Sequence, residues 1–140
     1  MELLAEFIVA TPAEAIAFNG GRDIEAALVA RHKGFTELEL GTLFDALKGA
    51  DLYSTNLDVF EIVRQEDEGG VMTMRIPEAM VRLLMALDEE RLIEVGDLWS
   101  DSDELGERDT IELYRVIGDL VRLSRRAARE NKGLYVWNAS

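Results

Sequence analysis

Residues 59–77 read VFEIVRQEDEGGVMTMRIP, and this stretch decides the fold class. Its first part, 59–65, is apolar and β-branched, which fits a strand or a helix equally well by periodicity alone. A polar connection that ends in two glycines follows at 66–70, and residues 71–76 then largely alternate as a strand does. Because two strand-like runs flank a glycine-ended turn, we predict a hairpin that pairs 59–65 with 71–76.

Three helices are predicted on the N-terminal side of the hairpin, each from a residue that can cap the first backbone N–H groups. In two of them a glutamate follows the capping threonine by three residues, which is the pattern of a capping box. Glycines end the second and third helices, since glycine accepts the left-handed conformation that stops a helix. The N-caps and helices are Thr11 with 13–18, Asp23 with 24–33, and Thr36 with 37–48.

Three more helices are predicted after the hairpin, opened in turn by Pro77, Asp88 and Asp109. The last and longest runs to Lys132, just before Gly133. One side of it is apolar and the other carries five arginines. The apolar side is Leu113, Ile117, Leu120, Val121, Ser124 and Ala128, and the arginines are Arg115, Arg122, Arg125, Arg126 and Arg129.

Apolar, β-branched runs at 3–9 and 134–137 predict a strand near each end of the chain. Together with the central hairpin they give a small, mostly antiparallel sheet. We therefore predict an α+β fold, a single domain over residues 1–140 in which five to six helices pack on that sheet.

The composition excludes several classes of protein. The chain has 140 residues, with 28 carboxylates against 15 basic groups and a net charge of −13, so a general nucleic-acid or anionic-membrane binder is not expected. An apolar fraction of 48% argues against disorder. The absence of cysteine removes disulfides and cysteine chemistry. With neither a secretory signal pattern nor an apolar run of spanning length, the expected location is the cytoplasm.

The negative charge is concentrated in the middle of the chain. Residues 51–110 hold seventeen carboxylates against five basic groups, a balance of −12, whereas residues 1–50 give −4 and residues 111–140 give +3. The simplest interpretation is internal: the arginine-bearing last helix lies beside the acidic segment and relieves its self-repulsion.

The functional interpretation is an anionic face that binds a basic protein partner. Trp99 would give that face an aromatic anchor of the kind that interfaces favour. Its helical spacing from Leu92 and Val95 instead predicts a core position, and we favour the core. The predicted partner-binding residues are Glu94, Asp97, Trp99, Asp101, Asp103, Glu104 and Glu107.

Residues 101–112 read DSDELGERDTIE and partly match the twelve-residue calcium loop of an EF-hand. The loop would lie between two helices, as an EF-hand requires. A simpler explanation is that Asp109 caps the helix after it, with Glu112 completing the cap. The matching positions are Asp101, Asp103, Gly106, Asp109 and Glu112, and the departures are Leu105 and Arg108.

His32 is the only histidine, and we predict that it interacts with the dipole at the C-terminal end of the helix 24–33. It is also the one candidate general base for a small carboxylate-dependent enzyme. The carboxylate pairs at 89–90 and 101–103 lie in polar stretches, where a catalytic rise in pKa is not expected. An enzyme is therefore the less favoured class, and no cofactor is expected.

The arrangement of helix caps, glycines and element boundaries along the chain resembles that of a group of small bacterial proteins of unknown function. The resemblance implies neither an activity nor a role for any residue. It is carried by the segments 34–38, 69–70, 75–78 and 134–137 and by Leu123, Ala127 and Ala128.

Three interpretations of the function follow, each from a different class of protein. The first is a non-enzymatic interaction protein, of the inhibitor or immunity type, whose acidic surface meets a basic protein. The second is a calcium-responsive helix–loop–helix at 101–112. The third is a small enzyme that uses carboxylates and His32.

Overall fold

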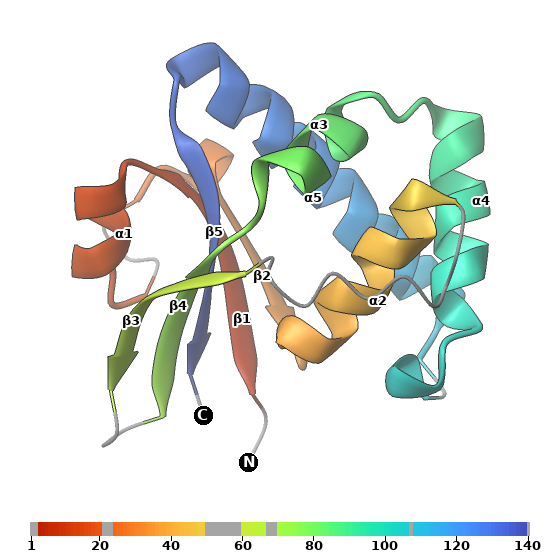
Figure 1. Ribbon diagram of the computed structural model, residues 1–140, viewed down its shortest axis with the longest axis horizontal. Coiled ribbons are helices and arrows are strands. Elements are labelled where there is room, and N and C mark those ends of the chain that lie inside the picture. Colours follow the sequence, from red (N-terminus) through yellow and green to blue (C-terminus); the bar gives the residue numbers. More distant parts are fainter. Residues whose placement is uncertain (1–2, 21–23, 50–59, 67–69, 107, 140) are drawn as a thin grey trace.

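A five-stranded antiparallel sheet forms one layer of the protein in the computed structural model (Figure 1). The structure describes residues 3–20, 24–49, 60–66, 70–106 and 108–139. The strands are β1 (Leu4–Ala10), β2 (Val29–Lys33), β3 (Glu61–Glu66), β4 (Val71–Arg75) and β5 (Gly133–Ala139). Their order across the sheet is β2-β1-β5-β4-β3.

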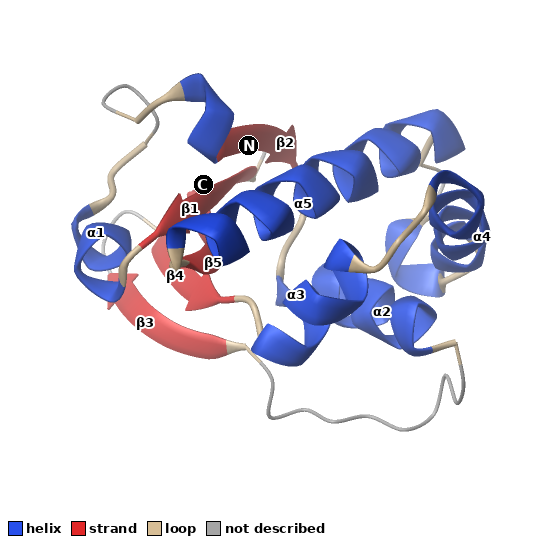
Figure 2. Cartoon of the chain, turned by 90° about the horizontal axis from the view of Figure 1, so that it is seen from above, coloured by secondary structure: helices blue, strands red, loops and turns tan. Residues whose placement is uncertain are grey.

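Helices cover both faces of this sheet unequally. Figure 2 shows α2, α3, α4 and α5 on one side of the strands and the short α1 on the other. The α+β prediction, with helices packed on an antiparallel sheet, is confirmed. The helices are α1 (Pro12–Ala17), α2 (Glu37–Lys48), α3 (Glu78–Met85), α4 (Glu89–Ser100) and α5 (Thr110–Glu130), with 3₁₀ turns η2 (Ala26–Leu28) and η3 (Asp103–Leu105).

Two apolar clusters, one on each face, hold the layers together. Successive strand residues point to opposite faces of a sheet. Phe7 and Val136 therefore join the large cluster under α2–α5, whereas Ile8 and Tyr135 join a smaller cluster with Ala15 of α1. Apolar side chains of the strands therefore pack against helices on both faces of the sheet.

The two central strands come from opposite ends of the chain. β1 and β5 pair over seven positions, from Leu4 with Ala139 to Ala10 with Gly133. The predicted hairpin is also present as β3 and β4, with an irregularity in the register between Ile62 and Arg64. The predicted first position of that hairpin, Val59, lies outside the described residues.

The helix starts predicted at Thr11 and Thr36 are present with their capping hydrogen bonds. The Thr11 backbone N–H donates to Glu14 Oε1 at 2.8 Å, and the Thr36 N–H donates to Glu39 Oε2 at 2.9 Å. The last helix ends two residues earlier than predicted, because Asn131 adopts the left-handed conformation at φ 56°. Asparagine accepts this conformation more readily than most residues.

The prediction of a helix over 24–33 is wrong. Only η2 is helical there, and Val29–Lys33 form β2, which pairs with β1 from Ile8 with Val29 to Leu4 with Lys33. The free hydrogen-bonding edge of β1 and the burial of Val29 and Ala30 outweigh the helix propensity of the alanines before them. The proposed N-cap, Asp23, lies outside the described residues.

Candidate functional site

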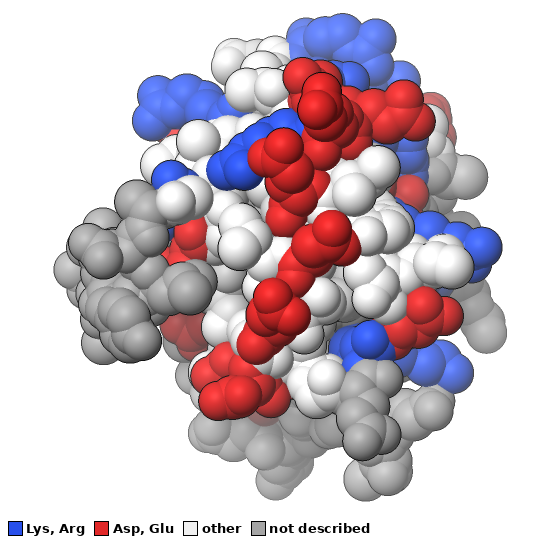
Figure 3. Space-filling model, turned by 90° about the vertical axis from the view of Figure 1, so that its right-hand side faces the viewer, with Lys and Arg blue, Asp and Glu red and all other residues white. Residues whose placement is uncertain are grey.

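Exposed carboxylates gather along the outward side of α4 and continue into η3. The Asp88 side chain accepts a hydrogen bond from the Arg91 N–H at 2.7 Å and begins the helix, and Val95, Gly96 and Trp99 turn its other side inward. Figure 3 looks at the side of the molecule on which α4 lies and shows a band of Asp and Glu crossing it. We call this surface the acidic face; its exposed carboxylates are Glu90, Glu94, Asp97, Asp101, Asp103 and Glu104.

Trp99 is not part of that face, so its predicted role as an anchor is wrong and the favoured core position is confirmed. It is 0% exposed, and its Nε1–H lies 3.0 Å from both Glu39 O and Thr42 Oγ1 of α2. The ring therefore joins α4 to α2. The remaining predicted partner residue, Glu107, lies outside the described residues.

Two other apolar side chains of α4 are exposed, whereas Trp99 is buried. Ile93 is 45% exposed and Leu98 is 41% exposed, and both belong to α4. They lie among Glu90, Glu94 and Asp97 on the same helix, at spacings that place all of them on its solvent side. The sequence already places Leu98 beside Trp99 among these carboxylates. The exposure of Ile93, which follows Leu92 in the same apolar run, depends instead on how α4 is rotated against α2 and α5.

Among the residues that the structure describes, few cations offset the charge of the acidic face. Arg91 lies 3.1 Å from Glu94, as one exposed pair. Asp97 accepts a hydrogen bond from the Tyr114 hydroxyl, which raises the pKa of Tyr114 because the carboxylate favours the neutral phenol. Most of the face is therefore free to interact with an external charge.

The arginines of α5 do not offset the acidic segment, so this part of the internal interpretation is wrong. α5 does pack against α4, where Tyr114 lies against Gly96. Among the described residues, however, no α5 arginine forms an ion pair with a carboxylate of 60–110; Arg126 pairs with Glu130 and Arg122 lies 3.8 Å from Asp119, both within α5. Arg122, Arg125 and Arg129 come later in the helix and line a hollow together with Met85 of α3.

The loop predicted to bind calcium is used for helix caps and ion pairs. Asp109 Oδ1 accepts from the Ile111 N–H at 3.0 Å, and Glu112 lies 3.5 Å from Arg108. Within the described ranges, no group of three or more carboxylates or histidines is placed to hold a metal ion. The calcium interpretation has no support in this geometry.

His32 lies in β2 and not at a helix end, so the prediction of a dipole interaction is wrong. Its Nε2 is 2.8 Å from Asp119 Oδ2 of α5, and its ring lies near those of Phe7 and Phe35. Asp119 is the partner that the sequence did not identify, because the two residues are 87 positions apart. The pair joins the edge of the sheet to α5, and His32 lines neither of the two hollows described next.

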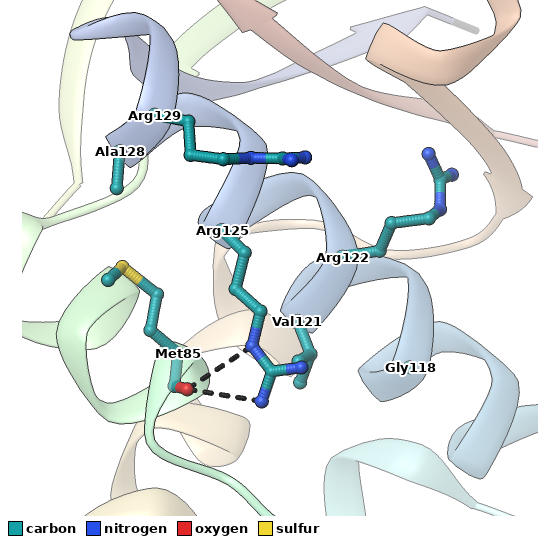
Figure 4. A pocket seen from close by; sticks show the side chains of 7 residues that line it. All are labelled: Met85, Gly118, Val121, Arg122, Arg125, Ala128 and Arg129. Carbon is teal, nitrogen blue, oxygen red and sulfur yellow. Dashed lines mark hydrogen bonds between the residues drawn. The ribbon is translucent and has the colours of Figure 1, made fainter.

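The described surface has a hollow of about 610 Å³ between α3 and α5 (Figure 4). Its apolar lining comes from Met85, Val121 and Ala128, and three arginines of α5 surround it. Ala128 is exposed, contrary to its predicted place on the apolar side of this helix; Ala127 is buried instead. The arginines are Arg122, Arg125 and Arg129.

A second hollow of about 280 Å³ shares Met85 and Ala128 with the first and continues it toward the start of β5. Glu78 is the one carboxylate in the linings of the two hollows. A carboxylate-lined cavity, which the enzyme interpretation requires, is therefore not provided by either of them.

No helix in the described ranges is both long and apolar enough to cross a membrane. Comparisons of the chain with protein-family models, curated proteins and solved structures gave no match. The resemblance to small bacterial proteins of unknown function stays a prediction.

Proposed function

We propose that the protein is a non-enzymatic binding module, of the inhibitor or immunity type, whose acidic face holds a basic protein partner. The observation that carries this proposal is the pair of exposed apolar residues, Ile93 and Leu98, surrounded by carboxylates on one side of α4. Interfaces commonly combine an apolar centre with a polar rim. Here the rim is anionic, which selects for lysine and arginine on the partner.

The charge of the face supports the choice of partner. Complementary charges accelerate the encounter of two proteins and disfavour wrong partners. Because exposed charges are screened by salt, such binding weakens as ionic strength rises. The helix that carries the face is fixed by the Trp99 hydrogen bonds to α2, so little ordering is required on binding.

The test uses two double variants and two matched controls. Ile93→Ser with Leu98→Ser removes the apolar centre, and its control is Ile16→Ser with Leu38→Ser, which are 51% and 61% exposed on other helices. Glu90→Lys with Asp101→Lys reverses two charges of the face. Its control, Glu25→Lys with Glu61→Lys, changes the net charge equally at exposed positions elsewhere.

Immobilised wild-type protein is exposed to cell extract at low ionic strength, and the retained protein is identified, purified and measured by calorimetry. We expect a basic protein whose affinity falls by about tenfold or more in both face variants, as for the central residues of an interface, and little in both controls. A partner that is acidic, or one that binds all four variants alike, would contradict the proposal.

A further inference from the structure

The two hollows between α3 and α5 form one continuous groove, since they share Met85 and Ala128. We call it the arginine groove. Its lining combines six cationic side chains with the single carboxylate of Glu78, on a protein whose net charge is −13. The cations are Arg75, Arg82, Arg122, Arg125, Arg129 and Lys132.

Arg122 and Arg125 of the first hollow are held in place mainly by hydrogen bonds to backbone carbonyls. Arg125 donates to the carbonyl oxygens of Met85 and Leu87, the latter at 3.0 Å, at the C-terminal end of α3. Arg122 donates to Ala27 O at 2.9 Å. A carbonyl orients a guanidinium but leaves its charge and its other N–H donors available.

Arg82 and Arg129 make no hydrogen bond or ion pair to another residue that the structure describes. Figure 4 shows the Arg129 side chain extending along α5 in the direction of Arg122, while Arg125 turns toward Met85. Positive charge thus surrounds the first hollow from several directions. No carboxylate lines it, and the one described carboxylate that pairs with its arginines is Asp119, 3.8 Å from Arg122.

The shape and lining of the groove define a class of ligand. Guanidinium groups pair with phosphate oxygens through parallel hydrogen bonds. Met85, Val121 and Ala128 form an apolar wall beside them, which suits a carbon skeleton attached to the phosphate.

The net negative charge of the protein favours a small ligand over a nucleic acid in this groove. A polymer of phosphates would extend beyond the groove into the field of a protein with a charge of −13. A single phosphate group instead meets mainly the local cations, because more distant charges are screened. We infer that the arginine groove is a binding site for a small organic phosphate, a phosphomonoester with an apolar substituent.

The experiment titrates the full chain with phenyl phosphate, inorganic phosphate and phenol, and follows backbone amide signals by NMR. Phenyl phosphate should bind saturably and shift the signals of α3 and α5. It should bind several-fold more tightly than inorganic phosphate, because it also covers the apolar wall. Phenol alone should not saturate the site, since it lacks the phosphate.

Arg129→Gln tests the first hollow and Arg82→Gln tests the second. Neither substitution removes a hydrogen bond within the described structure. Each should weaken phenyl phosphate binding by about tenfold, the effect of losing one charge-assisted contact. Arg115→Gln is the control, because Arg115 is an exposed arginine of the same helix outside the groove lining.

Three results would each overturn the inference. They are the absence of saturable phenyl phosphate binding to the wild-type protein, unchanged binding in both groove variants, and an equal loss in Arg115→Gln. Tighter binding of a single-stranded oligonucleotide than of phenyl phosphate would replace the small ligand with a nucleic acid. Thermal unfolding of each variant checks that the fold is retained.

Discussion

Trp99 is the residue on which the packing of α4 against α2 depends. Its indole N–H bonds both Glu39 O and Thr42 Oγ1, inside the largest apolar cluster. In Trp99→Phe a ring still fills much of the space, but both Nε1–H hydrogen bonds are lost, and Glu39 O keeps the hydrogen bond from the Thr42 hydroxyl at 2.7 Å. We expect the free energy of unfolding, measured in urea, to fall by about 1–3 kcal/mol from the lost hydrogen bonds, together with a smaller packing loss.

Trp137→Phe is the matched control for that prediction. Trp137 is also nearly buried, at 8% exposed, but its Nε1 has no hydrogen-bond partner in the described structure. The same substitution there removes ring volume without removing a hydrogen bond. Equal losses of stability in the two variants would contradict the role that we give to the Trp99 N–H.

Tyr114 provides a test of the charge on the acidic face. The Asp97 carboxylate accepts a hydrogen bond from its hydroxyl group and raises the pKa of the phenol. This bond stabilises the folded state below the ordinary tyrosine pKa of about 10 and is lost as the pH rises through the elevated value. An NMR titration of the Tyr114 ring carbon should give a higher pKa in the wild type than in Asp97→Asn; identical values would contradict the contact.

At the scale of elements, Gly96 sets the distance between α4 and α5. A Cβ at this position would lie 2.5 Å from Cδ1 and Cε1 of Tyr114, so the two helices could not keep their present separation. Gly96→Ala should lower the free energy of unfolding by about 1–3 kcal/mol because of this overlap. Chemical denaturation measures the change.

Gly41 in α2 is the natural comparison, since a Cβ there meets no atom within 4 Å. Gly41→Ala should raise the stability by up to about 1 kcal/mol, because alanine favours the helix and nothing opposes it. A stabilising effect at both glycines would show that Tyr114 moves aside easily and that the helix contact is not tight.

The elements that the sequence could predict are those with local signals. Thr11, Thr36 and Asp88 carry their own caps, and the helices after them begin where these residues indicate. β2 could not be predicted in this way, because its strand character comes from the edge of β1, which is adjacent in space and not in sequence. The partnership of His32 with Asp119 was hidden for the same reason.

At the scale of the whole molecule, the location of the charge could be predicted but its arrangement could not. The excess of carboxylates in the middle of the chain is visible in the composition, and the acidic face comes from that region. That Arg122, Arg125 and Arg129 line the hollow beside Met85 of α3 depends on the rotation and the crossing of packed helices. Those depend on contacts such as Gly96 with Tyr114, between residues 18 positions apart.

The pairing of β1 with β5 has a consequence for biosynthesis. Leu4 pairs with Ala139, and Figure 1 shows β1 beginning and β5 ending side by side, at the same end of these two central strands. While the ribosome is still making α5, the strand pair β1–β2 and the hairpin β3–β4 have no strand between them to join them. The sheet therefore closes only after the final strand has left the exit tunnel, and until then the nascent protein exposes two unpaired strand edges to other chains and to chaperones.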